Sequence, residues 1–305
     1  VGLNESDGTG LQVLANGDSA VTDIALDTVT LGNNGVGLDV FANDTARVAN
    51  VSAETVLASG NADRAAGLFA GTASAGGATI ENVSVSEAGF NDTVSGTGLA
   101  METDGSSTII GVDLTSVDAG NNTRGLDVLA DGDSSIADLS TDTVLFGESD
   151  GDAGAFEATG AGATIEDLFF ELTGFNESVG TGLTLLAEDG AISNVTLDTV
   201  LAANNSAGLN ATATGSGVIE DLSFQTAGFN KSDGAGLEFS ADDGTIRNIS
   251  MDTVTAGNND VGIDATATGT GLISGISTDT VLFGESTGDA GVFEATGAGA
   301  TIEDL

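Results

Sequence analysis

The feature that most constrains this chain is a short corner motif that recurs along its whole length. The motif is an aliphatic residue, a variable residue, then Asn, Asp or Gly, and then a second aliphatic residue, as in residues 246–249. Asn, Asp and Gly are the residue types that adopt a left-handed backbone conformation at the least cost, so the motif predicts a sharp bend once per repeat. Successive third positions lie 27 to 32 residues apart. They are Asp23, Asn50, Asn82, Gly111, Asp138, Asp167, Asn194, Asp221, Asn248, Gly275 and Asp304.

Each repeat also contains short alternating runs of the kind that form strands. A glycine such as Gly125 opens a first run at 125–130, a second run at 135–137 approaches the corner, and a third at 139–144 leaves it. Alternation bounded by turn residues favours strands over helices. The sequence therefore predicts an all-β fold, a single parallel β-helix of about 11 coils with about 28 residues and three short strands each. We expect it to be right-handed, because parallel crossover connections are.

The chain shows no linker and no change of composition that would mark a domain boundary. Val1 and Leu305 both fall within a coil, so we expect residues 1–305 to be one continuous solenoid segment, incomplete at both ends. The expected partners are then the rest of a longer chain, or copies that associate end to end or side by side, because an uncapped solenoid exposes its core. Residues 143–168 and 280–305 are near-identical, which points to copying of whole blocks rather than to one unique groove.

The charge of the chain is extreme. It has 47 acidic and 5 basic side chains, and a net charge of −42. Self-repulsion of this size destabilises a compact state at ordinary salt, whereas molar salt shortens the screening length to about 3 Å. Excess acid, almost no Lys and small apolar residues resemble the composition of proteins from extreme halophiles. We expect diffuse monovalent cations around the chain, and neither nucleic acid nor an anionic membrane surface as a partner.

Composition also excludes several kinds of active site. The sequence has no His, Cys, Trp, Tyr or Pro, so imidazole and thiolate metal sites and Ser–His–Asp triads are excluded. No run of about 20 apolar residues is present, so we expect no direct insertion into a membrane.

By repeat period and corner pattern, the whole chain resembles the pectin-lyase-like parallel β-helices, many of which cleave acidic polysaccharides. That resemblance implies clustered Asp residues with a Gly-His-Gly and an Arg-x-Lys element in glycosidases, or Ca²⁺ and a basic residue in lyases. Here Asp242-Asp243 is a pair of acids, but His and Arg-x-Lys are absent. The basic residues lie in different coils, at Arg47, Arg64, Arg124, Lys231 and Arg247. We therefore expect no enzyme, although a two-carboxylate hydrolase needs only Asp and Glu.

No cofactor is required by any motif, and calcium is the one specific ion that the loops suggest. Acidic turns offer hard oxygen ligands of the kind that Ca²⁺ prefers, and the alternative is a solvated acidic turn. The weak candidates are Asp131, Asp133, Glu148, Asp150 and Asp152.

Twelve Asn-x-Ser/Thr sequons occur, and in an exported protein those in loops would be the better acceptors of glycans. The loop candidates are Asn91, Asn121, Asn176, Asn204 and Asn230; four further sequons coincide with corner residues, where we expect Asn to be structural. Three of the loops read Gly-Phe-Asn, and we expect their Phe side chains to plug the core.

The sequence predicts a non-catalytic structural or adhesive shaft that is extracellular, on a cell or virion surface, in a halophilic archaeon or its virus. The alternatives are a binding module such as a viral fibre or an adhesin that recognises a glycan or host surface, and a polysaccharide-cleaving enzyme. An exposed aromatic row would favour binding, and two carboxylates about 5 to 10 Å apart in a groove would favour hydrolysis.

Overall fold

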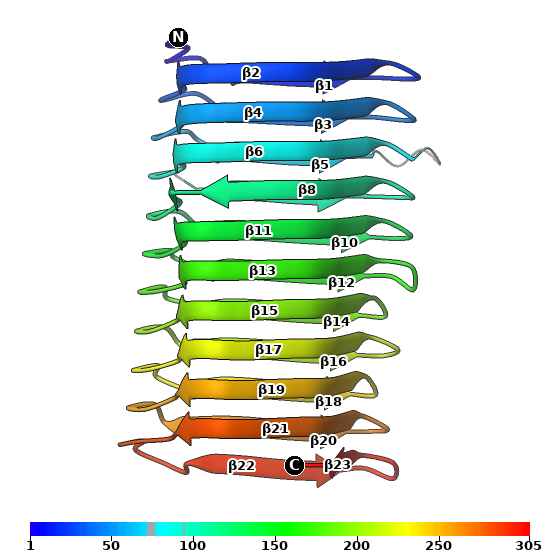
Figure 1. Cartoon of the computed structure of the whole chain (residues 1–305), viewed down its shortest axis with the longest axis vertical. Coiled ribbons are helices and arrows are strands. Elements are labelled where there is room, and N and C mark those ends of the chain that lie inside the picture. The colour runs from blue at the N-terminus through cyan, green and yellow to red at the C-terminus, as the bar shows by residue number, and fades with distance from the viewer. Residues whose placement is uncertain (72–76, 94) are drawn as a thin grey trace.

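The computed structural model describes residues 1–71, 77–93 and 95–305, and these form a single stack of β-coils (Figure 1). The N- and C-terminal coils lie at opposite ends of the stack, and each coil contacts the coils directly before and after it. The predicted all-β parallel solenoid of about eleven turns is confirmed. In the described part of the chain, no helix has the length and apolarity to cross a membrane.

The first strand of each coil belongs to an eleven-stranded parallel sheet. Neighbouring strands pair in register, so that Leu126 lies beside Leu99 in one direction and Gly154 in the other. In sheet order, the strands are β1 (Thr9–Ala15), β3 (Val36–Ala42), β5 (Arg64–Ala70), β7 (Thr97–Thr103), β10 (Arg124–Asp131), β12 (Gly154–Thr159), β14 (Thr181–Glu188), β16 (Ala207–Thr214), β18 (Ala235–Asp242), β20 (Val261–Thr268) and β22 (Gly291–Thr296).

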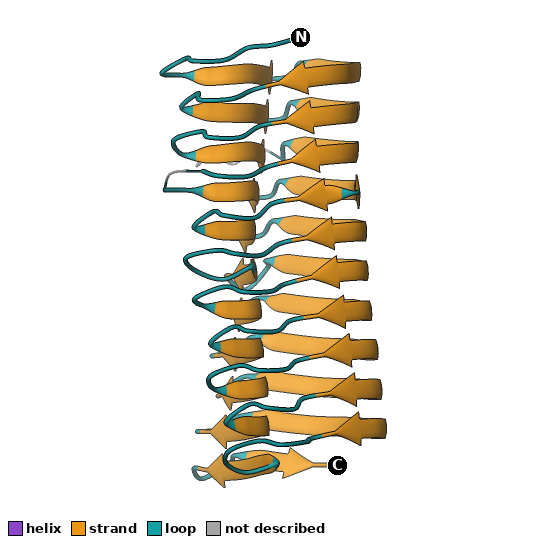
Figure 2. Cartoon of the chain, turned by 90° about the vertical axis from the view of Figure 1, so that its left-hand side faces the viewer, coloured by secondary structure: helices purple, strands orange, loops and turns teal. Residues whose placement is uncertain are grey.

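The rest of each coil contributes to a twelve-stranded parallel sheet. The strands, most of them eleven residues long, are β2 (Ala20–Thr30), β4 (Arg47–Leu57), β6 (Thr79–Gly89), β8 (Thr108–Thr115), β11 (Ser135–Leu145), β13 (Thr164–Gly174), β15 (Ala191–Leu201), β17 (Val218–Gly228), β19 (Thr245–Thr255), β21 (Leu272–Leu282) and β23 (Thr301–Glu303). The short strand β9 (Val117–Asp118) continues β8 after Ser116 and pairs with β6 and β11. Figure 2 shows the two sheets facing each other, joined by loops.

Every predicted corner residue bends the backbone. All eleven have positive φ, between 53° at Asn82 and 70° at Gly111. Apart from β9 and β23, the bend falls at the fourth residue of each strand of the twelve-stranded sheet, so the predicted second and third strands are two arms of one hydrogen-bonded strand. Some corner side chains are linked between coils: the Asn50 Nδ2 donates to Asp23 Oδ1 at 2.9 Å, and the Asn248 Nδ2 donates to Asp221 Oδ1 at 2.9 Å.

The core lies between the two sheets and consists of one aliphatic layer per coil. Phe90, Phe175 and Phe229 of the Gly-Phe-Asn loops are buried, which confirms that they plug the core. Where two Phe loops follow each other, the rings of Phe146 and Phe175 stack with centroids 5.5 Å apart. Aromatic pairs of this geometry stabilise a core by about 0.5–1.5 kcal/mol beyond the area that they bury.

In most coils, a glycine at the start of the strand in the eleven-stranded sheet allows close approach between coils. At Gly208, a Cβ atom would lie 2.4 Å from the carbonyl oxygen of Gly236 and 2.8 Å from the Cβ of Phe229. A side chain at Gly208 would therefore force the coil of Gly236 or the Phe229 ring to shift.

Candidate functional site

The outer face of the eleven-stranded sheet carries the most varied side chains on the solenoid. The fourth residue of each seven-residue strand forms one outward column, and the sixth residue forms a second. Strand register places Asp39 beside Gly67, and Phe41 beside Phe69. Side chains that are far apart in sequence therefore stand one strand spacing apart, about 4.8 Å.

An aromatic and charged cluster lies on β3 and β5. The rings of Phe41 and Phe69 stack at 4.8 Å with 21° between their planes, and the Arg64 guanidinium lies 4.4 Å from the Phe69 centroid. Arg64 also holds buried Asp39, with Nε–Oδ1 at 3.0 Å and Nη2–Oδ2 at 3.3 Å. Burial raises the pKa of Asp39, while Arg64 acts in the opposite direction. The cluster offers a flat apolar surface beside a partly exposed cation.

A hollow continues this cluster along the same face. Its lining includes Phe41, Phe69, Glu102, Leu129 and Asp131. Burial raises the pKa of Glu102, and the charge of Asp127 in the next coil adds to the increase. The hollow thus combines aromatic rings, an aliphatic side chain and a carboxyl group that holds its proton more tightly than usual.

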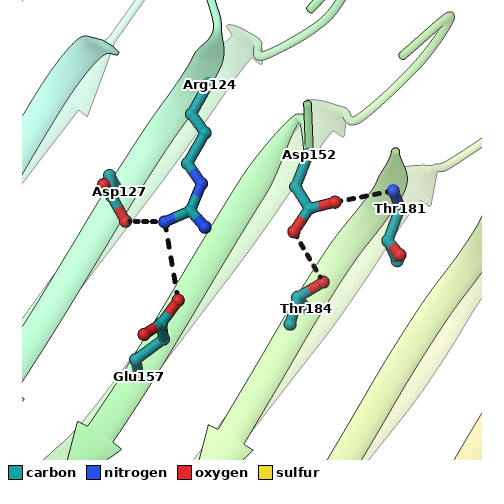
Figure 3. Close-up of polar contacts among 6 residues, drawn as sticks. All are labelled: Arg124, Asp127, Asp152, Glu157, Thr181 and Thr184. Atoms are coloured by element: carbon teal, nitrogen blue, oxygen red, sulfur yellow. Dashed lines mark hydrogen bonds and ion pairs between the residues drawn. The ribbon is translucent and has the colours of Figure 1, made fainter. Parts of the chain in front are cut away.

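Arg124 organises a second charged group on β10 and β12 (Figure 3). Its Nη1 lies 2.8 Å from Asp127 Oδ1 and 3.5 Å from Glu157 Oε1, so one cation bridges two coils. One coil further on, the carboxylate of Asp152 accepts hydrogen bonds from the Thr181 N–H at 2.7 Å and the Thr184 hydroxyl at 3.1 Å.

Two carboxyl groups meet further along the same face. Glu238 on β18 and Asp264 on β20 are register partners. Burial raises the pKa of Glu238, and the charge of Asp264 raises it further. A pair of adjacent carboxyl groups, one of them with a raised pKa, is a common arrangement in acid–base sites.

The candidate calcium ligands do not gather into one site. Asp131 accepts a hydrogen bond from the Thr159 hydroxyl at 3.0 Å, and Asp152 is engaged by Thr181 and Thr184 as described above. Among the residues with described positions, no group of three acidic side chains could hold a metal ion. The calcium expectation therefore gains no support from the geometry.

The candidate glycan acceptors fall into two structural groups. Asn121 and Asn204 are exposed on loops. Asn91, Asn176 and Asn230 are half-buried, and each Oδ1 accepts a backbone N–H of the next coil, at 2.8, 2.9 and 2.8 Å. Exposure favours Asn121 and Asn204 as acceptors, and glycosylation itself stays a prediction.

Sequence reasoning missed a column of buried asparagines in the same loops. Asn205 accepts the Ser178 N–H at 2.9 Å and donates to the Phe175 carbonyl oxygen at 2.8 Å, which ties its coil to the previous one. Asn122 and Asn259 bind the loops of Phe90 and Phe229 in the same way. A visible signal was the alternation of Phe-x-x-Ser/Thr loops with Ala-x-x-Asn loops. Asn34 and Asn61 complete the column.

A hollow at the C-terminal end is lined by Met251 and Ile276 of the core and by the exposed ring of Phe293. In the earlier copy of the repeated block, the counterpart of Phe293 is Phe156, which is buried and packs against Phe170 of the same coil with ring centroids 5.6 Å apart. The hollow is therefore surface of the core rather than a binding site.

No protein-family model matches this chain, and no curated protein matches its sequence. Two solved structures are similar. The A-module of the mannuronan C-5 epimerase AlgE4 from Azotobacter vinelandii has a TM-score of 0.52 and 11% identity, covering 99% of this chain and 80% of that one. PfbA, a surface adhesin of Streptococcus pneumoniae, has a TM-score of 0.24 and 12% identity, covering 89% and 85%. At these identities, the epimerase module supports the β-helix fold and nothing finer.

The first of these structures corrects one prediction. The expectation that the chain is not an enzyme is contradicted, because nearly its whole length shares the fold of an enzyme module. The expectation rested on basic residues that are scattered in sequence. In a solenoid, residues one repeat apart stand side by side, as Arg124 and Glu157 do across 33 positions, so scatter in sequence does not exclude a site.

Proposed function

We propose that this chain is a stiff, anionic β-solenoid of a cell-surface or filament protein that works in concentrated salt, in a halophilic archaeon or its virus. The observation that carries the proposal is the unbroken register of both sheets from the first coil to the last. Every coil is held to its neighbours by backbone hydrogen bonds, a corner and an apolar layer. Such an array resists bending and extension along its whole length.

The surface chemistry supports work in brine. Of the 5 basic side chains, Arg47, Arg64, Arg124 and Arg247 each pair with a carboxylate, and 47 acidic groups remain a large excess. Like charges stack about 4.8 Å apart along the outward columns. This spacing exceeds the screening length of about 3 Å at molar salt and is well below the 10 Å at 0.1 M.

Transfer from about 3 M to about 0.1 M NaCl tests the proposal, with circular dichroism as the readout. We expect the β-sheet signal to collapse at low salt and to return when salt is restored. Sucrose is the matched control, since it favours compact states without screening charge. An unchanged spectrum at low salt, or full rescue by sucrose, would contradict the screening argument.

A mechanical test addresses the shaft role directly. Single molecules pulled from both ends in brine should unfold in steps that each release one coil, because each coil contacts only its neighbours. Extension at low force without discrete steps would contradict the proposed role.

A second candidate function is carbohydrate binding on the outer face of the eleven-stranded sheet. It is favoured by the Phe41–Phe69 stack, because sugar rings pack their C–H faces against aromatic surfaces, and by Arg64, which can bind acidic groups. The hollow lined by Glu102 and Leu129 lies alongside.

Titration of uronic-acid and neutral oligosaccharides in brine, with product analysis by mass spectrometry, tests binding and turnover together. We expect Phe69→Ala to weaken binding and Leu14→Ala, on the same column two coils away, to leave it unchanged. Equal affinity of the parent and of Phe69→Ala would remove this candidate.

A further inference from the structure

On the outer face of the twelve-stranded sheet, the sixth and ninth positions of the strands form mostly polar columns, with one local exception on β13. The sixth residue of these strands is Ser or Thr in most coils, and the ninth is Thr in most. On β13, these positions are Phe169 and Leu172, and their exposed fractions are 38% and 50%. Register places Phe169 between Ser140 and Thr196. A large apolar side chain thus replaces a hydroxyl in both columns of the same coil.

Two further leucines extend this apolar surface. Leu145 on β11 and Leu201 on β15 occupy the last position of the strands on either side, and are 40% and 46% exposed. We define the β13 patch as Leu145, Phe169, Leu172 and Leu201. Apolar surface gathered on an otherwise polar array marks an interaction site more often than single exposed residues do.

The backbone of the patch is strained. Leu172 has a φ of +48°, a conformation that bulky side chains rarely adopt. The ninth residues of the adjacent strands, Thr143 and Thr199, share it at +57° and +58°, whereas those of β4, β19 and β21 do not. A leucine that is both exposed and strained contributes little to folding. Strain of this kind is often stored at functional sites.

An acidic column crosses the patch, between the positions of Phe169 and Leu172. Asp142, Glu171 and Asp198 occupy the eighth position of three successive strands and are register partners. This is the longest acidic run in that column; a Gln or another uncharged residue interrupts it elsewhere, as at Ser86, Thr115 and Gln225. The same face is hollowed beside this column on both sides of the patch, along Ser52 and Glu54 and along Ser250 and Asp252.

From this arrangement we infer that the β13 patch binds a basic amphipathic segment of a partner protein. Apolar side chains of the partner would cover Phe169 and Leu172, and its Lys or Arg side chains would pair with Asp142, Glu171 and Asp198. Charge complementarity disfavours a second copy of this chain, because each copy carries a net charge of −42 and its four arginines already hold carboxylates. A neutral glycan would leave the acidic column without a counter-charge.

The test uses a synthetic peptide of alternating Leu and Lys that carries one Trp. The chain has no Trp or Tyr, so Trp fluorescence reports on the probe alone. A second peptide with Ser in place of each Leu carries the same charge and measures non-specific attraction to the acidic surface. Titrations are run with the whole chain at a salt concentration where its circular dichroism shows the folded state.

The variant F169S/L172T restores the residues that other coils carry at these columns, so it should fold. We expect the Leu-Lys peptide to bind the parent about tenfold more tightly than the Ser-Lys peptide does, and this preference to vanish in the variant. L57T is the matched control, an exposed leucine at the last position of β4, and should keep the preference. E171Q tests the acidic column without touching the apolar residues, and should weaken binding of both peptides.

Four outcomes would overturn the inference. The first is equal binding of the two peptides by the parent, and the second is an unchanged preference in F169S/L172T. The third is sedimentation that shows a dimer of the parent and a monomer of the variant, which would make a second copy the occupant. The fourth is displacement of the Leu-Lys peptide by a neutral oligosaccharide, which would make the occupant a glycan.

Discussion

At the scale of the residue, the solenoid depends on positions where only a few side chains fit the backbone. The corner residue must adopt positive φ, and an asparagine there can also bind a neighbouring coil. Asn194 does both, with a φ of +53° and a side-chain amide that donates to the Asp167 carboxylate. Asn and Asp are tolerated in this conformation because their short polar side chains form local hydrogen bonds.

Asn194→Ala should therefore lower the free energy of unfolding by about 1–2 kcal/mol, the cost of a left-handed conformation for a residue with Cβ, plus the lost hydrogen bond. Asn194→Gly loses only the hydrogen bond and should cost less. Denaturant unfolding at fixed salt measures both, and an Ala variant at least as stable as the Gly variant would contradict the argument.

The buried asparagines should matter more than the corners. Asn205→Ala leaves the Ser178 N–H and the Phe175 carbonyl group buried without partners, and each orphaned group costs about 1–3 kcal/mol. Asn210→Ala, on the half-exposed outer face of β16, is the control and should change stability by less than about 0.5 kcal/mol. Similar losses in the two variants would show that the buried hydrogen bonds do not hold the coils together.

Titration of Glu238 gives a prediction about pH. Burial, followed by the charge of Asp264, raises its pKa in the folded state above its ordinary value of 4.5. When the pKa of a carboxyl group is higher in the folded state than in the unfolded state, its contribution to stability is complete at pH values below the unfolded-state pKa. This contribution is lost as the pH rises through the folded-state pKa. Glu238→Gln should therefore be more stable than the parent at pH 7, and the difference should disappear below about pH 4. Thermal melts at the two pH values measure it, and a difference that persists in acid would contradict this cause.

At the scale of the element, coils fit together through pairs of large and small side chains. Leu145 at the end of β11 covers Gly174 at the end of β13, where a Cβ would lie 2.9 Å from Leu145 Cδ1 and 2.8 Å from Asn176 Nδ2. The pairs Leu57–Gly89 and Leu201–Gly228 repeat this arrangement in other coils. A strand end is thus shaped by the coil before it.

Gly174→Ala should destabilise the fold by about 1–3 kcal/mol through overpacking, although its φ allows alanine. The double variant Leu145→Ala/Gly174→Ala should recover part of that loss, because the leucine methyl group is gone. A double-mutant cycle measures the coupling. Purely additive effects would show that Leu145 is not the side chain that excludes Cβ.

Periodic residues were predictable from the sequence, and exceptions to the period were not. The corner column and the plugging Phe residues recur at fixed spacing, so their geometry follows from the repeat alone. Arg64 stacked on Phe69, and the exposed pair Phe169 and Leu172, occur once each. Whether these residues are exposed, and which side chains they contact, depends on which columns face outward. The columns follow from strand register, which the structure provides. The buried Asn column was periodic, but it was hidden among the polar residues of a loop.

At the scale of the whole molecule, the order of the two loop types should affect stability. Deletion of residues 195–248 removes two repeats and leaves the Phe175 loop followed by Ala256 and Asn259, the same pairing as before. Deletion of residues 195–221 removes one repeat and leaves the Phe175 loop followed by Phe229 and Ser232, without an asparagine for the buried backbone groups.

We therefore expect the melting temperature of the two-coil deletion to lie within about 2–4 °C of that of the parent. The one-coil deletion should melt at a lower temperature than the two-coil deletion. Circular dichroism melts in the same brine make the comparison. A one-coil deletion as stable as the two-coil deletion would show that the alternation of loops has no energetic role.

The alternation of Phe-x-x-Ser/Thr and Ala-x-x-Asn loops bears on how such a chain avoids misassembly. Neighbouring coils are so alike that a strand could pair with a coil one repeat out of place and still satisfy its backbone. Such a slip would in many places leave a buried asparagine without its backbone partners, or leave those backbone groups without an asparagine. The loop types therefore help to specify which coil each successive coil stacks on.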